Sequence, residues 1–274
     1  MSKKDKFIDV EQLIASKNPK LLKRTPKFLI NYLKKKLHQD EINAFIDDHE
    51  GDNGYIFSRE IIKYFNIKVE IQGMENIPKE GGVIITLNHP LGGMDAIAII
   101  DEFYPYREDF KFIVNDLLMN LENLKDMFVG VNKHGTNSKE GLEQVDELYA
   151  SDQVIFVFPA GLVSRRKRGK VEDLEWKKTF ITRSRKYHKN VIPCYIDGEL
   201  TKFFYRLANF RSSIGIKANI EMLYLVDELF KQKNKTIRLQ FGKPISYENF
   251  DRSKKDSEWA QWVKSKVYEL RDKK

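Results

Sequence analysis

The sequence predicts an α/β protein with a mostly parallel central sheet, flanked by helices and preceded by an N-terminal helical segment. Two observations carry this prediction. From residue 68 on, short runs rich in β-branched and aromatic residues alternate with segments of helical periodicity. Before that point, apolar residues recur at helical spacing among many lysines. We therefore expect a basic helical segment at residues 1–66, able to associate with a membrane, and an α/β domain at residues 67–274.

The clearest N-terminal helix is expected to begin at Pro26, because proline is favoured at helix starts. Its apolar residues at helical spacing are Phe28, Leu29, Tyr32, Leu33 and Leu37, and they stand beside Lys27, Lys34, Lys35 and Lys36. Such a basic amphipathic helix can lie in the headgroup region of an anionic membrane. It can equally pack on the main domain, and the two interpretations are compatible.

The α/β domain is expected to contain six strands and five helices. The strands are predicted at residues 69–71, 83–87, 111–114, 154–158, 191–196 and 236–241. The helices are predicted at residues 96–102, 139–150, 176–188, 220–230 and 253–270. Strands that alternate with helices favour a parallel sheet with helices on its faces and ligands at the strand ends.

The net charge of +8 is unevenly distributed. Residues 1–38 hold eleven Lys/Arg against three Asp/Glu, and residues 165–189 hold the same numbers, so the rest of the chain is acidic. Two basic regions on an acidic body indicate an anionic partner: a membrane surface, a phosphate-bearing ligand or a nucleic acid. Solvated lysines without a partner are the alternative interpretation.

Several classes are disfavoured by what the sequence lacks. No apolar run reaches the ~18 residues that a membrane-spanning helix needs, and no secretory signal is readable at the N-terminus, so we expect a cytoplasmic protein. The single cysteine, Cys194, excludes an internal disulfide and a zinc site built with cysteine partners. No nucleophile elbow, P-loop, dinucleotide fingerprint or H-E-x-x-H motif occurs.

The most informative stretch is Gly81–Ile100, GGVIITLNHPLGGMDAIAII, in which an apolar strand ends in Asn88 and His89. Two glycines follow before Asp95, and they permit a tight turn that brings its carboxylate back to the imidazole. An imidazole takes a proton from an alcohol near neutral pH, and a carboxylate on its other nitrogen fixes the tautomer. We therefore expect His89 to activate an acceptor hydroxyl. In the alternative interpretation, Asp95 is a helix-capping acid and His89 a loop residue.

This block resembles the active-site motif of the glycerolipid acyltransferases, typified by 1-acyl-glycerol-3-phosphate acyltransferase, in which Asn-His is followed shortly by Asp. The spacing differs, because five residues rather than four separate His89 from Asp95. The NHPLGGMD form is similar to the branch that contains hemolysin-related and ornithine- or glycine-lipid acyltransferases. The longer spacing therefore bears on the acceptor more than on the reaction.

The second block is VIFVFPAGLVSRRKRGK, residues 154–170, which resembles the acceptor-binding block Phe-Pro-Glu-Gly-Thr-Arg-Ser of that family. Phe158, Pro159 and Gly161 match, whereas Ala160 and Leu162 replace the usual Glu and Thr. Arginine grips phosphate or carboxylate groups bidentately. The expected acceptor-binding residues are Asn88, Phe158, Gly161, Arg165, Arg166 and Arg168, with Arg165 first among them. A basic loop that touches lipid headgroups without specificity is the alternative.

Two further blocks resemble the family less closely. VIPCYIDGE, residues 191–199, is similar to its late Val-Ile-Pro strand, and we expect Pro193 and Gly198 to be structural. Residues 111–133 are the counterpart of its strand–helix–strand block, with Asn115, Asn132 and Lys133 as polar groups at loop ends. Lys133 is the one of these predicted to bind substrate.

The resemblance, which covers roughly residues 67–245, implies an O-acyltransferase on the cytoplasmic face of a membrane, bound peripherally. It implies acyl carrier protein or CoA thioester as donor, a lysolipid or glycerol-phosphate-type acceptor, no metal and no cofactor. The rival hypothesis is a non-catalytic protein that binds a membrane or a nucleic acid through the basic regions. Residues 165–189 hold only three aromatic residues for base stacking, so we expect no nucleic-acid partner.

Overall fold

A computed structural model describes residues 6–131 and 139–271 of the chain. Contacts within the chain divide it into two units. The helical unit consists of Met1–Asp52 and Thr201–Lys231, and the sheet unit consists of Asn53–Leu200 and Gln232–Lys274. The sequence predicted a boundary between residues 66 and 67. In the structure, helix α5 (Gly54–Tyr64) packs on α6 (Gly93–Phe103) of the sheet unit, and a later segment joins the N-terminal helices.

The sheet unit is built on seven strands in the order β1-β9-β8-β2-β5-β3-β4. Five of them run parallel to one another, whereas β9 is antiparallel to β8 and parallel to β1. The strands are β1 (Lys68–Gln72), β2 (Val83–Leu87), β3 (Phe110–Asn115), β4 (Phe128–Val131), β5 (Val154–Val157), β8 (Val191–Asp197) and β9 (Thr236–Phe241). The predicted α/β class with a mostly parallel sheet is confirmed.

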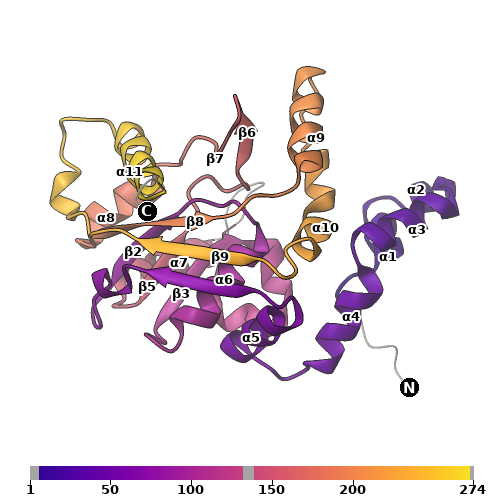
Figure 1. Ribbon diagram of the computed structural model, residues 1–274, viewed down its shortest axis with the longest axis horizontal. Helices are drawn as coiled ribbons and strands as arrows, with labels where there is room; N and C mark the ends of the chain where they lie inside the picture. The colour runs from indigo at the N-terminus through magenta and orange to yellow at the C-terminus, as the bar shows by residue number, and fades with distance from the viewer. Residues whose placement is uncertain (1–5, 132–138, 272–274) are drawn as a thin grey trace. The chain divides into compact units, whose positions relative to one another are not determined.

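Helices cover the sheet on both faces (Figure 1). On one face, α7 (Lys139–Ala150), α8 (Thr179–Tyr187) and α11 (Asp256–Leu270) form a core with side chains of β2, β5 and β8. On the other, Phe103 of α6 packs edge-on against Phe110 and Phe156. Every residue of β2 is buried because the strand lies in the middle of the covered sheet, which explains why four of its five residues are aliphatic.

Two strands of the sheet unit were not predicted. They are β6 (Arg165–Lys167) and β7 (Lys170–Glu172), which form a two-stranded sheet. Strand β4, which pairs with β3, lies at the end of the strand–helix–strand block expected at residues 111–133. Short 3₁₀ turns complete the unit at Met74–Asn76, Asp116–Asn120, Glu122–Met127 and Tyr247–Asn249.

The helical unit joins two distant parts of the chain. Its N-terminal part holds α1 (Val10–Lys17), α2 (Pro19–Arg24), α3 (Lys27–Lys36) and α4 (Gln39–Asp48). The segment between β8 and β9 adds α9 (Lys202–Ser213), a 3₁₀ turn η4 (Ile220–Tyr224) and α10 (Leu225–Phe230). Helix α9 was not predicted, and the helix expected at 220–230 is divided between η4 and α10. Within residues 6–131 and 139–271, no helix combines the length and apolar composition that crossing a bilayer requires.

Candidate active site

The site begins where β2 ends. The side chain of Asn88 binds the backbone of Ile196 on β8 in both directions: its Oδ1 accepts from the Ile196 N–H at 2.7 Å, and its Nδ2 donates to the Ile196 carbonyl at 2.8 Å. Asn88 is buried, and its amide fixes the ends of two neighbouring strands. Contact between Asn88 and a substrate remains a prediction from the sequence.

His89 and Asp95 face each other at the carboxyl end of β2. Gly92 has a φ of 72°, which glycine tolerates, and the turn it makes leads into α6 with Asp95 in the first turn. The Asp95 Oδ2 lies 2.9 Å from the His89 Nδ1, which is the contact that the sequence predicted. Asp95 therefore acts both as a first-turn acid of the helix and as the partner of the imidazole.

The environments of the two side chains differ. Asp95 is fully buried and also accepts the Leu91 N–H, at 3.0 Å from Oδ2 and 3.3 Å from Oδ1. Burial raises the pKa of the Asp95 carboxyl, and the hydrogen bond and charge of His89 only partly oppose this. The His89 side chain is 20% exposed, and its ring lies 4.4 Å from that of Phe158. Because Nδ1 contacts Asp95, any further partner of the imidazole binds at Nε2.

A second loop supports His89 from the end of β5. Gly161 lies in the turn after Pro159 with a φ of 63°, and its N–H donates to the Phe158 carbonyl at 3.0 Å. Further on, the Ser164 N–H donates to the His89 carbonyl at 2.8 Å. The two predicted motif blocks, distant in sequence, are therefore joined at His89 itself.

The cationic cluster that follows is a β-hairpin. Arg168 and Gly169 both have positive φ, 49° and 83°, and they form the two-residue turn between β6 and β7. The three arginines have different surroundings. Arg165 is buried and donates to the Val163 carbonyl at 2.5 Å, Arg166 forms an ion pair with Glu199, and Arg168 is exposed in the turn. The three side chains do not share one environment, and direct acceptor contact by any of them stays a prediction.

Asp173 was not identified from the sequence. It follows β7 and is buried, and its Oδ1 accepts the His89 N–H at 3.1 Å and the Ser164 hydroxyl at 2.6 Å. Its Oδ2 accepts the Trp176 Nε1–H at 2.9 Å. Burial raises the pKa of the Asp173 carboxyl although these donors oppose it. Asp173 therefore holds both motif loops together under His89.

A cavity of about 240 Å³ lies beside this loop. Its walls include Asn88 and Pro90 on either side of His89, the hairpin residues 169–171, and Tyr195. Charges of both signs line it, from Lys170 and Arg271 and from Asp197 and Glu199. The cavity is thus suited to a small polar group close to the His89 loop.

Lys133, predicted to bind substrate, and Asn132 lie outside the described residues. Among the residues that are described, no group of three or more His, Cys, Asp and Glu side chains is arranged to hold a metal ion. A histidine backed by a buried carboxylate at the end of a central strand is an arrangement suited to general-base chemistry on a hydroxyl.

Comparison with known proteins identifies the class. The family model described as "Acyltransferase" matches residues 12–274. The lyso-glycine lipid O-acyltransferase of Bacteroides thetaiotaomicron is 45% identical over 267 residues, which cover 96% of this chain and 97% of that protein. The protein of the same name from Phocaeicola vulgatus is 44% identical, over 96% of this chain and 95% of its own. The chain therefore belongs to the acyltransferase family, and the prediction of an acyltransferase enzyme is confirmed.

A solved structure is also similar. It is the crystal structure of the 1-acyl-sn-glycerophosphate acyltransferase PlsC from Thermotoga maritima, with a TM-score of 0.48 and 19% sequence identity over 89% of each chain.

Proposed function

We propose that this protein transfers a fatty acyl group from a thioester donor, acyl carrier protein or CoA, to the hydroxyl of a lyso-glycine lipid. The acceptor class is supported by two relatives of that name at 45% and 44% identity over nearly the whole chain. The single observation that carries the mechanism is the 2.9 Å contact between His89 Nδ1 and Asp95 Oδ2 at the end of β2.

In the proposed reaction, Nε2 of His89 accepts the proton of the acceptor hydroxyl while the oxygen attacks the carbonyl carbon of the thioester. The tetrahedral intermediate collapses, the carbon–sulfur bond breaks, and the departing thiolate takes the proton back from the imidazolium. The products are the acylated lipid and the free thiol. The buried Asp95 carboxylate favours the tautomer with hydrogen on Nδ1 and stabilises the imidazolium. Because a thioester is already an activated acyl group, the proposed reaction uses no metal or redox cofactor.

The test is a matched acceptor panel with the purified protein. Acyl carrier protein and CoA thioesters are each offered with a lyso-glycine lipid, a lyso-ornithine lipid and lysophosphatidic acid, and product is measured by mass spectrometry. We expect the highest kcat/KM with the lyso-glycine lipid. His89→Ala should reduce turnover by at least about 10³-fold without changing the thermal melt. Turnover of lysophosphatidic acid alone would contradict the acceptor, and an active His89→Ala variant would contradict the mechanism.

A further inference from the structure

The helical unit carries apolar side chains on surfaces that its own helices leave uncovered. In α3, Ile30 points inward and is buried, whereas Phe28 is 74% exposed and Tyr32 shares its face. In α9, Phe204 and Ala208 are buried, whereas Phe210, on another side of the helix, is 61% exposed. Each helix therefore has one packed face and one apolar face toward solvent.

The two exposed faces meet in an aromatic row. The Tyr32 hydroxyl of α3 lies 3.1 Å from the Tyr224 hydroxyl of η4, and the ring of Tyr224 packs against Phe203 of α9 at 5.0 Å, edge to face. Phe203 is itself exposed. The N-terminal helix and the segment between β8 and β9 thus contribute to one continuous surface.

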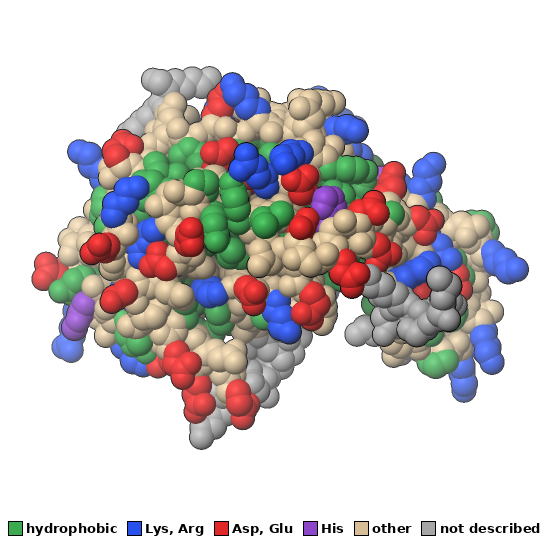
Figure 2. Space-filling model, turned by 90° about the horizontal axis from the view of Figure 1, so that it is seen from below, with side chains coloured by type: hydrophobic (Ala, Val, Ile, Leu, Met, Phe, Trp, Pro, Cys, Tyr) green, Lys and Arg blue, Asp and Glu red, His purple; other side chains and the backbone are tan. Residues whose placement is uncertain are grey.

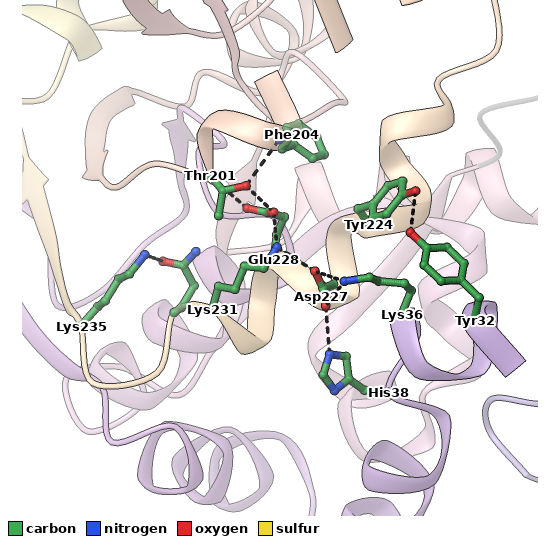
Figure 3. A network of polar contacts seen from close by, with 11 residues as sticks. Tyr32, Lys36, His38, Thr201, Phe204, Tyr224, Asp227, Glu228, Lys231 and Lys235 are labelled. Atoms are coloured by element: carbon green, nitrogen blue, oxygen red, sulfur yellow. Dashed lines mark hydrogen bonds and ion pairs between the residues drawn. The ribbon is translucent and has the colours of Figure 1, made fainter. Parts of the chain in front are cut away.

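A charge network holds these two segments together (Figure 3). Asp227 of α10 accepts from Lys36 of α3 at 3.2 Å and from Lys231 at 2.7 Å, and it lies 3.3 Å from Nε2 of His38. The imidazole of His38 stacks on Phe230 with ring centroids 3.7 Å apart. The relation between α3 and the later segment is therefore fixed by charges and by packing.

Exposed apolar residues alone identify nothing, because single ones occur on every protein surface. On the face drawn in Figure 2, apolar side chains lie in small areas between acidic and basic ones. Two segments of the helical unit contain basic residues and no acidic ones. Residues 19–36 hold seven Lys/Arg and no Asp/Glu, and residues 201–220 hold four and none. Of these, Lys34 is bound to Glu11, Lys36 to Asp227 and Arg211 to Glu221. Five others are exposed: Lys27, Lys35, Lys202, Arg206 and Lys217.

Exposed aromatic and aliphatic side chains beside exposed cations fit the interface of an anionic bilayer. We propose that the segment 202–217 and helix α3 form one membrane-contact surface, so that the segment between β8 and β9 is a second lipid-binding element beside the N-terminal helix. This rests on the proposed function, in which the acceptor is an amphiphile held in a bilayer. The exposed cations attract the protein to the anionic bilayer, and the exposed phenylalanines enter its headgroup region.

The experiment compares three double variants of the full chain by flotation with phosphatidylglycerol vesicles and with phosphatidylcholine vesicles. Phe210→Ser with Ile214→Ser alters the later segment, and Phe28→Ser with Leu29→Ser alters α3. Ile56→Ser with Leu142→Ser is the control, because these residues are 49% and 48% exposed in the sheet unit. We expect each of the first two pairs to lower the partition coefficient for phosphatidylglycerol vesicles by about tenfold, and the control to bind as the wild type.

If the wild type binds phosphatidylglycerol vesicles and the Phe210→Ser/Ile214→Ser variant binds them equally well, the later segment has no role in binding. Binding to RNA but to neither vesicle would overturn the lipid partner. Wild-type turnover of a short-chain, water-soluble acceptor is measured in parallel. If the protein binds vesicles but does not turn over the soluble acceptor, the proposed function is wrong and the membrane-contact surface is supported. If it turns over the acceptor but does not bind vesicles, only the membrane-contact surface is wrong.

A separate observation concerns Asp173, whose contacts converge on the backbone of His89. We infer that Asp173 is a positioning residue for His89 and a second negative charge that favours the imidazolium during catalysis. This also rests on the proposed function. The carboxylate holds the His89 N–H directly and the Ser164 loop through its hydroxyl, and Ser164 in turn binds the His89 carbonyl.

The charged groups around this carboxylate are few. From α11, the Tyr268 hydroxyl accepts the Asp173 N–H at 2.7 Å, and the Lys264 ammonium binds the Asp173 carbonyl at 2.5 Å rather than its carboxylate. The charge of Asp173 nevertheless acts on Lys264, as do those of Glu172, Lys167 and Glu175. Asp95 is the other acid facing His89. The three donors to the Asp173 carboxylate are a backbone amide, a hydroxyl and an indole, so none of these hydrogen bonds comes from a cation.

The test compares Asp173→Asn with Ser164→Ala, which removes one donor without changing charge. For Asp173→Asn we expect kcat to fall about tenfold with little change in KM, and the acid limb of the kcat–pH profile to move to lower pH, because an imidazolium without this charge loses its proton more readily. Ser164→Ala should leave the acid limb in place. An Asp173→Asn variant that melts as the wild type and keeps the wild-type acid limb would overturn the electrostatic role. An unchanged kcat would overturn the positioning role as well.

Discussion

Buried acids are held differently in the two units. In the sheet unit, Asp95 and Asp173 receive hydrogen bonds from backbone amides, a hydroxyl, an indole and one imidazole, and burial raises the pKa of both carboxyls. In the helical unit, each buried acid has a cation. Glu221 binds Arg211 at 2.7 and 3.1 Å, Glu228 binds Lys231 at 2.9 Å, and Asp227 binds Lys36 and Lys231.

Asp227 shows the contrast most clearly. Burial acts to raise the pKa of its carboxyl, as it does for Asp95, but hydrogen bonds and charge from Lys231, Lys36 and His38 outweigh burial and lower the pKa. The buried acids of the helical unit therefore stabilise its fold through ion pairs. The sheet unit keeps two carboxylates that are costly to ionise, and they are the ones beside His89. An acid that costs stability and contacts a candidate base indicates selection for chemistry.

The largest expected effect tests this difference at Asp95. Asp95→Asn should reduce kcat by about 10²- to 10⁴-fold, because the imidazole loses the partner that fixes its tautomer. The free energy of unfolding at pH 7 should stay equal or rise. Since the folded-state pKa of Asp95 is raised, its ionisation weakens stability as pH increases above 3.8, and the variant removes that loss.

The control is Asp101→Asn on the same helix, where burial also raises the carboxyl pKa but His89 is not contacted. Chemical denaturation and turnover are measured on both variants. We expect Asp101→Asn to keep full activity. A strong loss of stability in Asp95→Asn would mean that this carboxylate, like those of the helical unit, holds the fold together.

Arg211→Met should give the second largest effect, now on stability. The change leaves Glu221, which is fully buried, without its bidentate partner. Breaking such a pair costs about 3–5 kcal/mol. Hydrogen exchange of the α9 amides measures the loss locally, with Arg206→Met, exposed on the same helix, as the matched control. Equal exchange in the two variants would contradict the cohesive role of the pair.

Asp227→Asn should lower the free energy of unfolding by a smaller amount, about 1–2 kcal/mol at pH 7. The loss is smaller because Lys36 and Lys231 are partly exposed and stay hydrated in the variant. The folded-state pKa of Asp227 is lowered, so its stabilisation is complete above pH 3.8 and is lost as pH falls through the folded value. The difference in the free energy of unfolding between wild type and variant, measured by chemical denaturation, should therefore disappear in acid. A difference that does not depend on pH, or an equal one for Asp48→Asn at an exposed position, would contradict the stabilising role of the Asp227 charge.

Sequence reasoning found the features that are local. The strands β2, β5 and β8 are mostly apolar, since they lie in the middle of the covered sheet, and such runs can be recognised in the sequence alone. His89 and Asp95 were found because two glycines between them permit the turn that joins them. The α/β class followed from the alternation of such strands with helices.

The features that were missed lack a recognisable signal in the local sequence. Asp173 stands among Lys170, Glu172 and Glu175, and nothing local separates it from these solvated neighbours. The hairpin of β6 and β7 was missed because charged residues dominate it and because its turn places Arg168 at positive φ. Helix α9 was missed because aromatic residues lie on both its faces, which removes the amphipathic period.

The smallest expected effect is at Thr201, where α9 begins. Its hydroxyl oxygen accepts the Phe204 N–H at 3.4 Å and donates to Glu228 at 2.7 Å, so one side chain caps the helix and satisfies a buried acid. Thr201→Val keeps the shape and should cost about 1 kcal/mol, because the Thr201 N–H still binds Glu228 at 2.6 Å and Lys231 still pairs with it. Thr201→Ser, which retains the hydroxyl, is the control and should lie closer to the wild type in a urea titration. If Thr201→Val lowers the free energy of unfolding as much as Arg211→Met does, the buried acids of the helical unit depend on hydrogen bonds rather than on ion pairs. The contrast with the sheet unit would then disappear.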